Sequence, residues 1–300
     1  MKILVTGGAG FIGSNLVAAL ARKGHEVVVL DNFFLGTEKN LVGMDIRLVK
    51  ADITDYETVL KASGECDIIF NEAAASSSPM FKKEMRRSVS VNIDGFINVM
   101  NAAKENGVKR VVYASTSSIY GNTSGPLKED MKCVPVNLYA STKLMNEHVA
   151  LLSDGVETVG LRYMSVYGPG EEPKGMFANL ASQFLWAMRK GDSPVIYGDG
   201  SQTRDFTYVK DVVSANILAM ESGKRLNDVF NVGTGVETSL NGLVKIINKI
   251  LGKGIKPEYV GNDMKNYISS QKADLEKIRK CLGYEPEFTL EQGIKDMLNA

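Results

Sequence analysis

The chain has 300 residues, of which 44% are apolar and 23% charged, a composition typical of a globular protein of one or two domains. This composition excludes a disordered, collagen-like or coiled-coil chain, and a core of this size needs neither disulfides nor structural metal. The 35 basic and 35 acidic side chains leave no net charge. We therefore expect neither nucleic acid nor an anionic membrane as a partner.

The cysteines and the opening residues bear on the cellular compartment. Cys66, Cys133 and Cys281 are widely spaced, and His25 and His148 are the only histidines, so a zinc site is not expected. An odd number of cysteines without a C-x-x-C pair fits a reducing, cytoplasmic environment. Glycines interrupt the apolar residues at the start, and no run of 18 apolar residues occurs. Neither a signal peptide nor a membrane span is therefore expected.

Short apolar runs rich in β-branched residues alternate with longer segments of helical period over the first half of the chain. Six runs are predicted to be strands, at residues 3–5, 27–30, 46–49, 68–70, 111–113 and 158–161. Segments such as 15–23, 89–105 and 138–152 are long enough for crossover helices. Continuous apolar strands suit a parallel sheet covered on both faces. The pattern predicts an α/β, Rossmann-type doubly wound fold.

The sequence changes character after Tyr167-Gly168-Pro169-Gly170, where proline and glycine become frequent. Helices are predicted at about 176–190, 211–222 and 239–251, separated by short irregular segments. We interpret residues 1–165 as the doubly wound domain and residues 166–300 as a smaller mixed α/β substrate lobe. Parts of about 205–235 are expected to pack back on the first domain. A cleft between the two lobes is the default ligand site.

A glycine-rich segment, Thr6-Gly7-Gly8-Ala9-Gly10-Phe11-Ile12-Gly13, links the first predicted strand to a helix. Its glycines allow a tight turn and close approach of the backbone to a pyrophosphate, and the helix N-terminus supplies N–H donors. Asp31 ends the second strand, where a carboxylate can accept both ribose hydroxyls of adenosine. Since that carboxylate repels a 2′-phosphate and no Arg lies between residues 23 and 46, we expect NAD rather than NADP. The alternative is a plain glycine turn with Asp31 as a strand-end cap.

Tyr139 and Lys143 are four residues apart in a segment predicted to be helical, so they share one face. A phenol with a pKa of about 10 is a poor base at neutral pH, but a fixed ammonium nearby favours its phenolate. This spacing alone is common on helix surfaces. The Ser115-Thr116-Ser117 strand end strengthens the functional interpretation, because ligands bind at this edge of such sheets.

The motifs, taken in chain order, resemble the extended short-chain dehydrogenase/reductase family. They are TGGAGFIG at 6–13, DN at 31–32, AA at 73–74, N at 92, STSS at 115–118, YASTK at 139–143, RY and VYGPG within 162–170, RDFTYV at 204–209 and NVGTG at 231–235. Within that family they are similar to the NAD-dependent nucleotide-sugar epimerases and dehydratases. The resemblance extends over most of the chain.

The resemblance implies a role for each matching residue. Tyr139 would be the general base on a sugar hydroxyl, and Lys143 would hold the nicotinamide ribose. Thr116 would share a hydrogen bond with the same sugar oxygen. Asn92 would distort its helix and support a proton-relay water beside the lysine. Arg204 would meet the nucleotide's phosphates or ribose, and further substrate contacts are expected from Ser117, Ser165 and Asn179, the last of which could equally be a surface helical residue.

The same resemblance implies a set of residues around NAD. Asp52 and Ile53 could hold the adenine ring, although Asp52 could equally cap the next helix. The complete expected set is Gly7, Gly10, Phe11, Ile12, Gly13, Asp31, Asn32, Asp52, Ile53, Ala73, Ala74, Asn92, Ser115, Tyr139, Lys143 and Tyr163. No metal ligands are predicted.

The residues after Thr116 help to choose the reaction. Dehydratases and decarboxylases of this family carry acidic residues there, whereas this chain has Ser117 and Ser118. Without a carboxylate, elimination lacks its expected catalyst. The resemblance therefore implies 4-epimerisation of a nucleotide sugar, UDP-glucose/UDP-galactose or an N-acetyl form, through a 4-keto intermediate. The alternatives are a net NAD-dependent oxidoreductase, another dehydratase or decarboxylase, and a non-catalytic NAD sensor.

Several residues depart from the family pattern. Glu72 stands where the family has an apolar residue, in the segment Asn71-Glu72-Ala73-Ala74. Ser165 replaces the usual asparagine, and residues 258–265 lack the usual arginine that clamps the diphosphate. Replacement contacts are expected from Lys174, Lys256 or Lys265. The resemblance also implies a homodimer built on helices at about 84–105 and 138–152.

Overall fold

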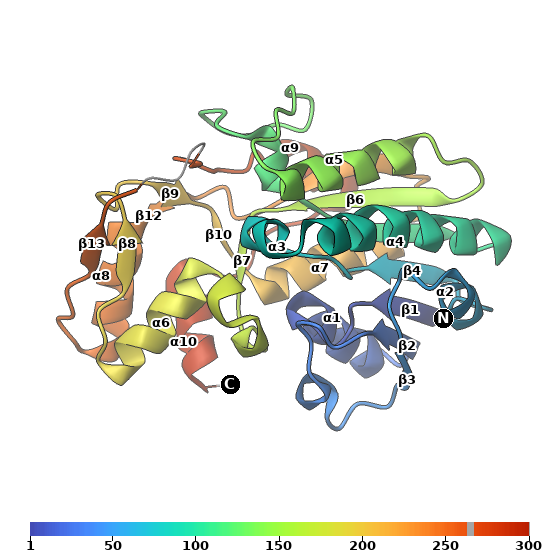
Figure 1. The fold of residues 1–300 in the computed structure, drawn as a ribbon, viewed down its shortest axis with the longest axis horizontal. Helices are drawn as coiled ribbons and strands as arrows, with labels where there is room; N and C mark the ends of the chain where they lie inside the picture. Colours follow the sequence, from blue (N-terminus) through green and yellow to red (C-terminus); the bar gives the residue numbers. More distant parts are fainter. Residues whose placement is uncertain (263–266, 300) are drawn as a thin grey trace.

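Seven parallel strands form the central sheet of the computed structural model, which describes residues 1–262 and 267–299. Their order across the sheet is β3-β2-β1-β4-β5-β6-β11 (Figure 1). The strands are β1 (Lys2–Thr6), β2 (Glu26–Asp31), β3 (Arg47–Lys50), β4 (Ile68–Asn71), β5 (Arg110–Thr116), β6 (Glu157–Tyr163) and β11 (Asn227–Val232). All six predicted strands are present, and the doubly wound fold is confirmed.

Apolar side chains at successive strand positions explain why both faces of the sheet are covered. Ile3 and Val5 of β1 belong to one hydrophobic cluster, while Leu4 between them belongs to another. Successive side chains of a strand point to opposite faces. A strand that is apolar at every position therefore needs helices on both sides.

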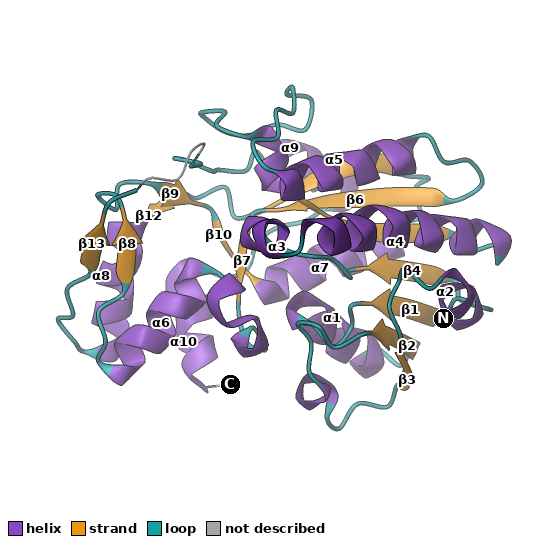
Figure 2. Ribbon diagram, in the orientation of Figure 1, coloured by secondary structure: helices purple, strands orange, loops and turns teal. Residues whose placement is uncertain are grey.

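Two layers of helices cover these faces (Figure 2). One layer contains α2 (Tyr56–Ala62), α4 (Met85–Glu105) and α5 (Leu138–Leu151), and the other contains α1 (Phe11–Arg22) and α7 (Val209–Glu221). The short α3 (Ser78–Lys83) precedes α4. Polar caps begin two of these helices, since Asp55 accepts a hydrogen bond from the Thr58 amide and Asn137 accepts one from the Ala140 amide.

The second part of the chain forms a smaller helical region with short strand pairs. Figure 1 shows α6 (Leu180–Lys190), α8 (Leu240–Leu251) and α10 (Leu290–Asn299) beside β8 (Val195–Tyr197) and β13 (Glu258–Val260). The remaining elements are β7 (Ser165–Tyr167), β9 (Thr203–Arg204), β10 (Phe206–Tyr208), β12 (Thr238–Ser239), α9 (Glu276–Leu282) and the 3-10 helices η1 (Glu38–Leu41), η2 (Ser117–Tyr120) and η3 (Glu172–Phe177).

Helix positions in this region match the sequence prediction with one correction. The helices predicted at 211–222 and 239–251 correspond to α7 and α8. The helix predicted at 176–190 is wrong at its start, because η3 ends at Phe177 and Asn179 caps α6 through a hydrogen bond from the Ala181 amide. Among the described residues, no helix combines the length and apolar character needed to span a membrane.

Candidate active site

A pocket lies at the carboxyl ends of the central strands. β1 lies between β2 on one side and β4 on the other, so the strand order reverses there. Ligands of doubly wound sheets bind at such a switch point. Residues from both parts of the chain line the pocket. They include every residue of the predicted catalytic, cofactor and substrate sets except Asn92 and Arg204; the alternative lysines are considered below.

The glycine-rich segment forms a close backbone contact at one end of this pocket. Gly7 has a φ of +67°, and a Cβ built on it would lie 2.6 Å from the amide nitrogen of Ala73. Any larger residue would therefore push the loop away from the end of β4. Gly10 begins α1 with its amide bonded to the Gly7 carbonyl at 3.0 Å. The loop and the helix N-terminus together suit the pyrophosphate of a dinucleotide.

Asp31 lies beside this loop with both carboxylate oxygens in hydrogen bonds. One oxygen accepts from the Ala9 amide at 2.9 Å and the other from the Phe33 amide at 2.7 Å. Burial nevertheless raises its pKa. The carboxylate is therefore fixed against the glycine-rich loop, and it lines the part of the pocket expected to hold the adenosine.

The hydrogen bonds of Asp52 show whether this residue caps the following helix. Asp52 accepts hydrogen bonds from the Asn32 side chain at 2.7 Å and from the Thr54 amide at 3.0 Å. Asp55 caps α2 instead, so the alternative that Asp52 caps this helix is wrong. Ile53 is buried and lines the pocket with Asp52.

Tyr139 and Lys143 project from the same face of α5 into the pocket. The Lys143 ammonium donates a hydrogen bond to the Ala114 carbonyl at 2.8 Å, and only 2% of the residue is exposed. Thr116 lines the same pocket as Tyr139, and its hydroxyl accepts a hydrogen bond from the Ser118 amide at 3.2 Å. The helix thereby brings a phenol and an ammonium to the end of β5, next to the residue expected to share the sugar oxygen.

The direction of the Tyr139 pKa corrects a prediction. The sequence predicts a lowered pKa from the neighbouring ammonium, but burial raises the Tyr139 pKa, Thr116 opposes this rise and Glu72 adds to it. Burial also lowers the pKa of Lys143 to about 8. The physical reason is that removal from water disfavours the charged form of each group.

Polar side chains flank Thr116 on both sides in the sequence. Ser117 accepts a hydrogen bond from the Gln271 amide at 3.1 Å, and both residues line the pocket. The Ser115 hydroxyl donates to Glu147 on α5. The sequence analysis missed Gln271, which comes from the far end of the chain and carries no local motif.

Asn92 and Arg204 are the two predicted catalytic or substrate residues that do not line the pocket. The Asn92 amide bonds to Ala75 and donates to the Thr142 hydroxyl at 2.9 Å, and α4 continues through it from Met85 to Glu105. Arg204 donates to the Thr203 carbonyl at 2.7 Å and stacks on Tyr267. Arg204 is not among the described residues that line this pocket, and its contact with the nucleotide stays a prediction.

Charged residues line the pocket as well. Two of them, Lys83 and Arg87, come from α3 and α4. Lys174 lines the pocket too, and its ammonium pairs with the fully buried Glu171 at 2.9 Å. Lys256 is not among the described lining residues, and Lys265 lies outside the described residues.

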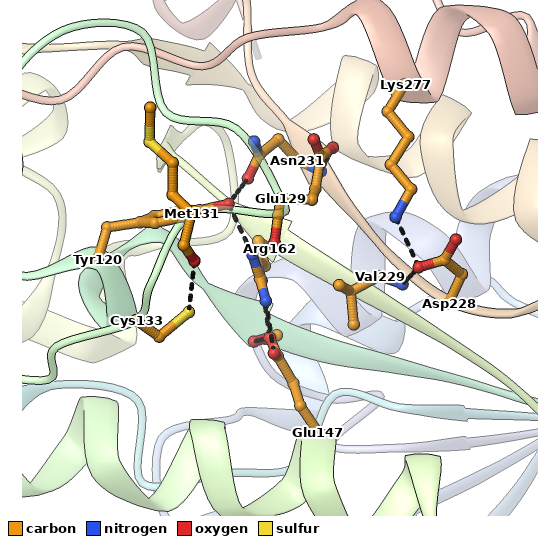
Figure 3. Close-up of polar contacts among 11 residues, drawn as sticks. Tyr120, Glu129, Met131, Cys133, Glu147, Arg162, Asp228, Val229, Asn231 and Lys277 are labelled. Carbon is orange, nitrogen blue, oxygen red and sulfur yellow. Dashed lines mark hydrogen bonds and ion pairs between the residues drawn. The ribbon is translucent and has the colours of Figure 1, made fainter.

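Behind the pocket, a buried ion pair anchors α5 to the sheet (Figure 3). Arg162 of β6 pairs with Glu147 of α5 at 2.8 Å, with 5% and 7% of the side chains exposed. Arg162 also donates to the Tyr120 hydroxyl at 2.7 Å, which in turn donates to Asn231 of β11 at 2.8 Å. Glu147 lies four residues after Lys143, and this spacing in the sequence could have indicated that both side chains lie on the same face of α5. The network fixes the helix that carries Tyr139 and Lys143.

Comparisons with known proteins agree with this arrangement. The sequence profile of the NAD dependent epimerase/dehydratase family matches residues 3–233. A putative UDP-glucose 4-epimerase of Methanocaldococcus jannaschii is 34% identical, and the match covers 99% of this chain and 97% of that protein. A UDP-N-acetyl-alpha-D-glucosaminuronate decarboxylase of Bacillus cytotoxicus is 32% identical, with 99% and 96% covered.

A solved structure is similar over the whole chain. The UDP-glucose 4-epimerase of Thermotoga maritima, crystallised with UDP-glucose, has a TM-score of 0.94 and 34% identity, and the match covers 100% of this chain and 98% of that one. The expected resemblance is therefore confirmed at the level of the family. The chain belongs to the NAD dependent epimerase/dehydratase family.

Proposed function

We propose that the protein is an NAD-dependent 4-epimerase of a UDP-hexose, either UDP-glucose/UDP-galactose or an N-acetyl form. The observation that carries this proposal is the meeting of Tyr139, Lys143 and Thr116 in a pocket whose other end is a dinucleotide cradle. The matches to the epimerases of M. jannaschii and T. maritima support it.

The residues of the pocket fit NAD. Gly7 and Gly10 line the pocket at the N-terminus of α1, where backbone N–H groups can meet a pyrophosphate. Asp31 is proposed to bind the adenosine ribose, Asp52 and Ile53 the adenine, and Lys143 the nicotinamide ribose. Further contacts are proposed from Ala73 and Ala74, which follow β4, and from Tyr163 at the end of β6. When bound, NAD would supply reversible hydride transfer.

The protein's own groups would hold and move protons during this reaction. Tyr139 accepts the proton of the sugar's C4 hydroxyl, and Thr116 hydrogen-bonds the same oxygen. Lys143 orients the ribose and keeps a positive charge near Tyr139. Tyr139 would later return this proton to the C4 oxygen of the 4-keto sugar, once the sugar has presented its opposite face to the cofactor. Because burial raises the Tyr139 pKa, its phenolate would be the stronger base for the first of these proton transfers.

The polar residues around Thr116 separate epimerisation from related reactions. Ser117 and Ser118 stand where elimination or decarboxylation would need an acid or base, and Gln271 bonds Ser117. These neutral groups can orient a sugar but cannot protonate a leaving hydroxyl. Ser165, Asn179 and Lys174 line the pocket near these groups and are proposed to contact the substrate.

One assay tests the proposal against its alternatives. The purified protein is incubated with UDP-glucose, UDP-N-acetylglucosamine and the GDP, dTDP and CDP hexoses, and the products are identified by NMR. We expect an epimer of a UDP-sugar without accumulation of NADH. Stoichiometric formation of NADH would show a net oxidoreductase. A shortened or dehydrated sugar would show a decarboxylase or a dehydratase. The absence of any product would favour a non-catalytic NAD sensor.

We also propose that the protein is a homodimer formed through α4 and α5. Large apolar side chains of these helices are exposed, among them Met85, Leu138, Met145 and Leu151. Such residues gathered on helices favour burial in an interface. Light scattering of the purified protein should give twice the mass of one chain, and the mass of a single chain would reject the dimer.

A further inference from the structure

Glu72 brings an ionisable carboxyl group to a position beside the proposed catalytic pair, where the family pattern has an apolar residue. It follows β4 directly, and its amide donates to the Thr6 carbonyl at 3.1 Å. The residue lines the same pocket as Tyr139 and Lys143. Its backbone is thus fixed against β1, and its side chain lies among the proposed reacting groups.

A directed chain of hydrogen bonds ends on this carboxyl group. The Asn216 side chain of α7 donates to the Tyr163 hydroxyl at 2.8 Å and to the Val212 carbonyl at 2.9 Å. The Tyr163 hydroxyl donates to Glu72 at 2.8 Å. Because the amide nitrogen already donates to the phenol oxygen, the single Tyr163 proton is directed to Glu72. A carboxylate is the form of Glu72 that accepts such a proton best.

The orientation of Asn216 supports this direction. Its buried Oδ1 has no hydrogen-bond partner among the described residues. Exchanging the nitrogen and the oxygen would place the oxygen against the Val212 carbonyl and leave two donations unmade. The amide is therefore held in the orientation that supplies Tyr163, although one buried acceptor stays unsatisfied.

The ionisable groups that act on Glu72 come from α5 and β6. They are Lys143, Tyr139 and Tyr163. Burial raises the pKa of Glu72 to about 7, and Tyr163 and Lys143 oppose this rise. Burial lowers the pKa of Lys143 to about 8, and Glu72 opposes this fall. Each of the two groups therefore opposes the shift that burial imposes on the other.

We propose that Glu72 is a positioning residue whose carboxylate holds Lys143 in its ammonium form, opposes the phenolate form of Tyr139, and so sets the pH range of proton transfer by this pair. The inference rests on the proposed function, which assigns proton transfer to Tyr139 and Lys143. An apolar residue at position 72 would leave both groups to lose their protons at lower pH.

The direct test is a titration of Lys143 in the holoenzyme. Lysines are labelled with carbon-13 at Cε, and the Lys143 resonance is identified by its absence from Lys143→Arg. Exposed lysines have pKa values of about 10.4, so this resonance is expected to be distinct. Glu72→Gln, which keeps the shape and an acceptor for Tyr163, should lower the Lys143 midpoint by about one pH unit. Glu57→Gln, an exposed carboxylate of α2, should not change it.

A second variant separates charge from packing. Glu72→Leu removes both the charge and the hydrogen bond from Tyr163, and we expect the same shift as for Glu72→Gln. An unchanged midpoint in Glu72→Gln would overturn the proposal, whether or not Glu72→Leu folds. A shift in Glu72→Leu alone would also overturn it, because packing rather than charge would then be responsible.

The pH dependence of kcat distinguishes failure of this inference from failure of the proposed function. With an active UDP-sugar, the loss of activity at high pH should begin about one unit lower in Glu72→Gln. Normal epimerisation with an unshifted profile and an unshifted Lys143 midpoint would reject the role of Glu72 alone. A shifted midpoint in a protein that epimerises no nucleotide sugar would reject the proposed function and retain the charge coupling.

Discussion

Tyr139 is the residue on which the proposed chemistry depends most. Its ring packs near Phe81, with centroids 6.2 Å apart, and it lines the same pocket as Thr116. Lys143 is fixed by the Ala114 carbonyl rather than by Tyr139. The phenol and the ammonium are therefore positioned by different parts of the fold, and a change in one need not displace the other.

Removal of the Tyr139 hydroxyl should abolish proton transfer without loss of the cofactor. We expect Tyr139→Phe to retain bound NAD and to lose at least about 100-fold in kcat, the usual effect of removing a positioned proton-transfer group. Tyr56→Phe, whose hydroxyl bonds Glu105 on the outer helices, is the matched control. Bound NAD is measured by its release on denaturation and kcat by NMR. Near-normal turnover in Tyr139→Phe would reject the proposed mechanism.

Asp31 should determine both the strength and the selectivity of NAD binding. Asp31→Asn removes the charge that accepts the ribose hydroxyls, and hydrogen bonds to charged groups contribute about 1.5–3 kcal/mol. We expect NAD to bind roughly 10- to 100-fold more weakly, with smaller discrimination against NADP. Calorimetric titration of the cofactor-free protein measures both affinities. Asp45→Asn, in an exposed loop, is the control, and an unchanged preference for NAD would contradict the assignment.

At the scale of elements, α5 depends on the buried pair between Glu147 and Arg162. Removing one partner leaves a buried charge uncompensated, so Glu147→Leu or Arg162→Met alone should lower the free energy of unfolding by about 3–5 kcal/mol. The double variant should recover much of this loss. Urea denaturation measures all three proteins.

An exposed ion pair provides the comparison for this element-scale prediction. Lys295 and Glu291 of α10 form an i,i+4 pair at 2.8 Å on the surface. Its removal by Lys295→Met should cost about 0.3–0.5 kcal/mol. Equal losses at the two sites would show that burial does not decide the contribution of the Glu147–Arg162 pair.

At the scale of the whole molecule, the central sheet is completed by residues far along the chain. β11 pairs with β6 from Asn227 to Val232, and α7 packs on α1. A fragment of residues 1–165 would expose the edge of β6 and the apolar face of α1. We expect this fragment to show no cooperative thermal transition by circular dichroism, in contrast to the full chain. A cooperative transition would support an autonomous domain that ends near residue 165.

Local sequence was sufficient to predict the strands of the first domain, the crossover helices and most of the pocket. Apolar runs predict buried strands because burial on both faces requires them, and glycines at 7, 10 and 13 predict a close backbone approach because no other residue fits there. The four-residue spacing of Tyr139 and Lys143 predicts a shared helix face because residues four apart are neighbours on the surface of a helix. These inferences depend on contacts within a few residues.

Only the tertiary structure decided the long-range partners. β11 carries polar residues at Asn227, Asp228 and Asn231, so its sequence gives little indication of a sheet strand, and its pairing with β6 supplies the stabilising contacts. The same holds for Gln271 beside Ser117 and for Tyr163 beside Glu72. Burial, which raises the Tyr139 pKa, is likewise set by the elements packed around a side chain. Sequence determines local conformation and the chemical groups available, whereas folding determines which distant groups meet and how far water is excluded from them.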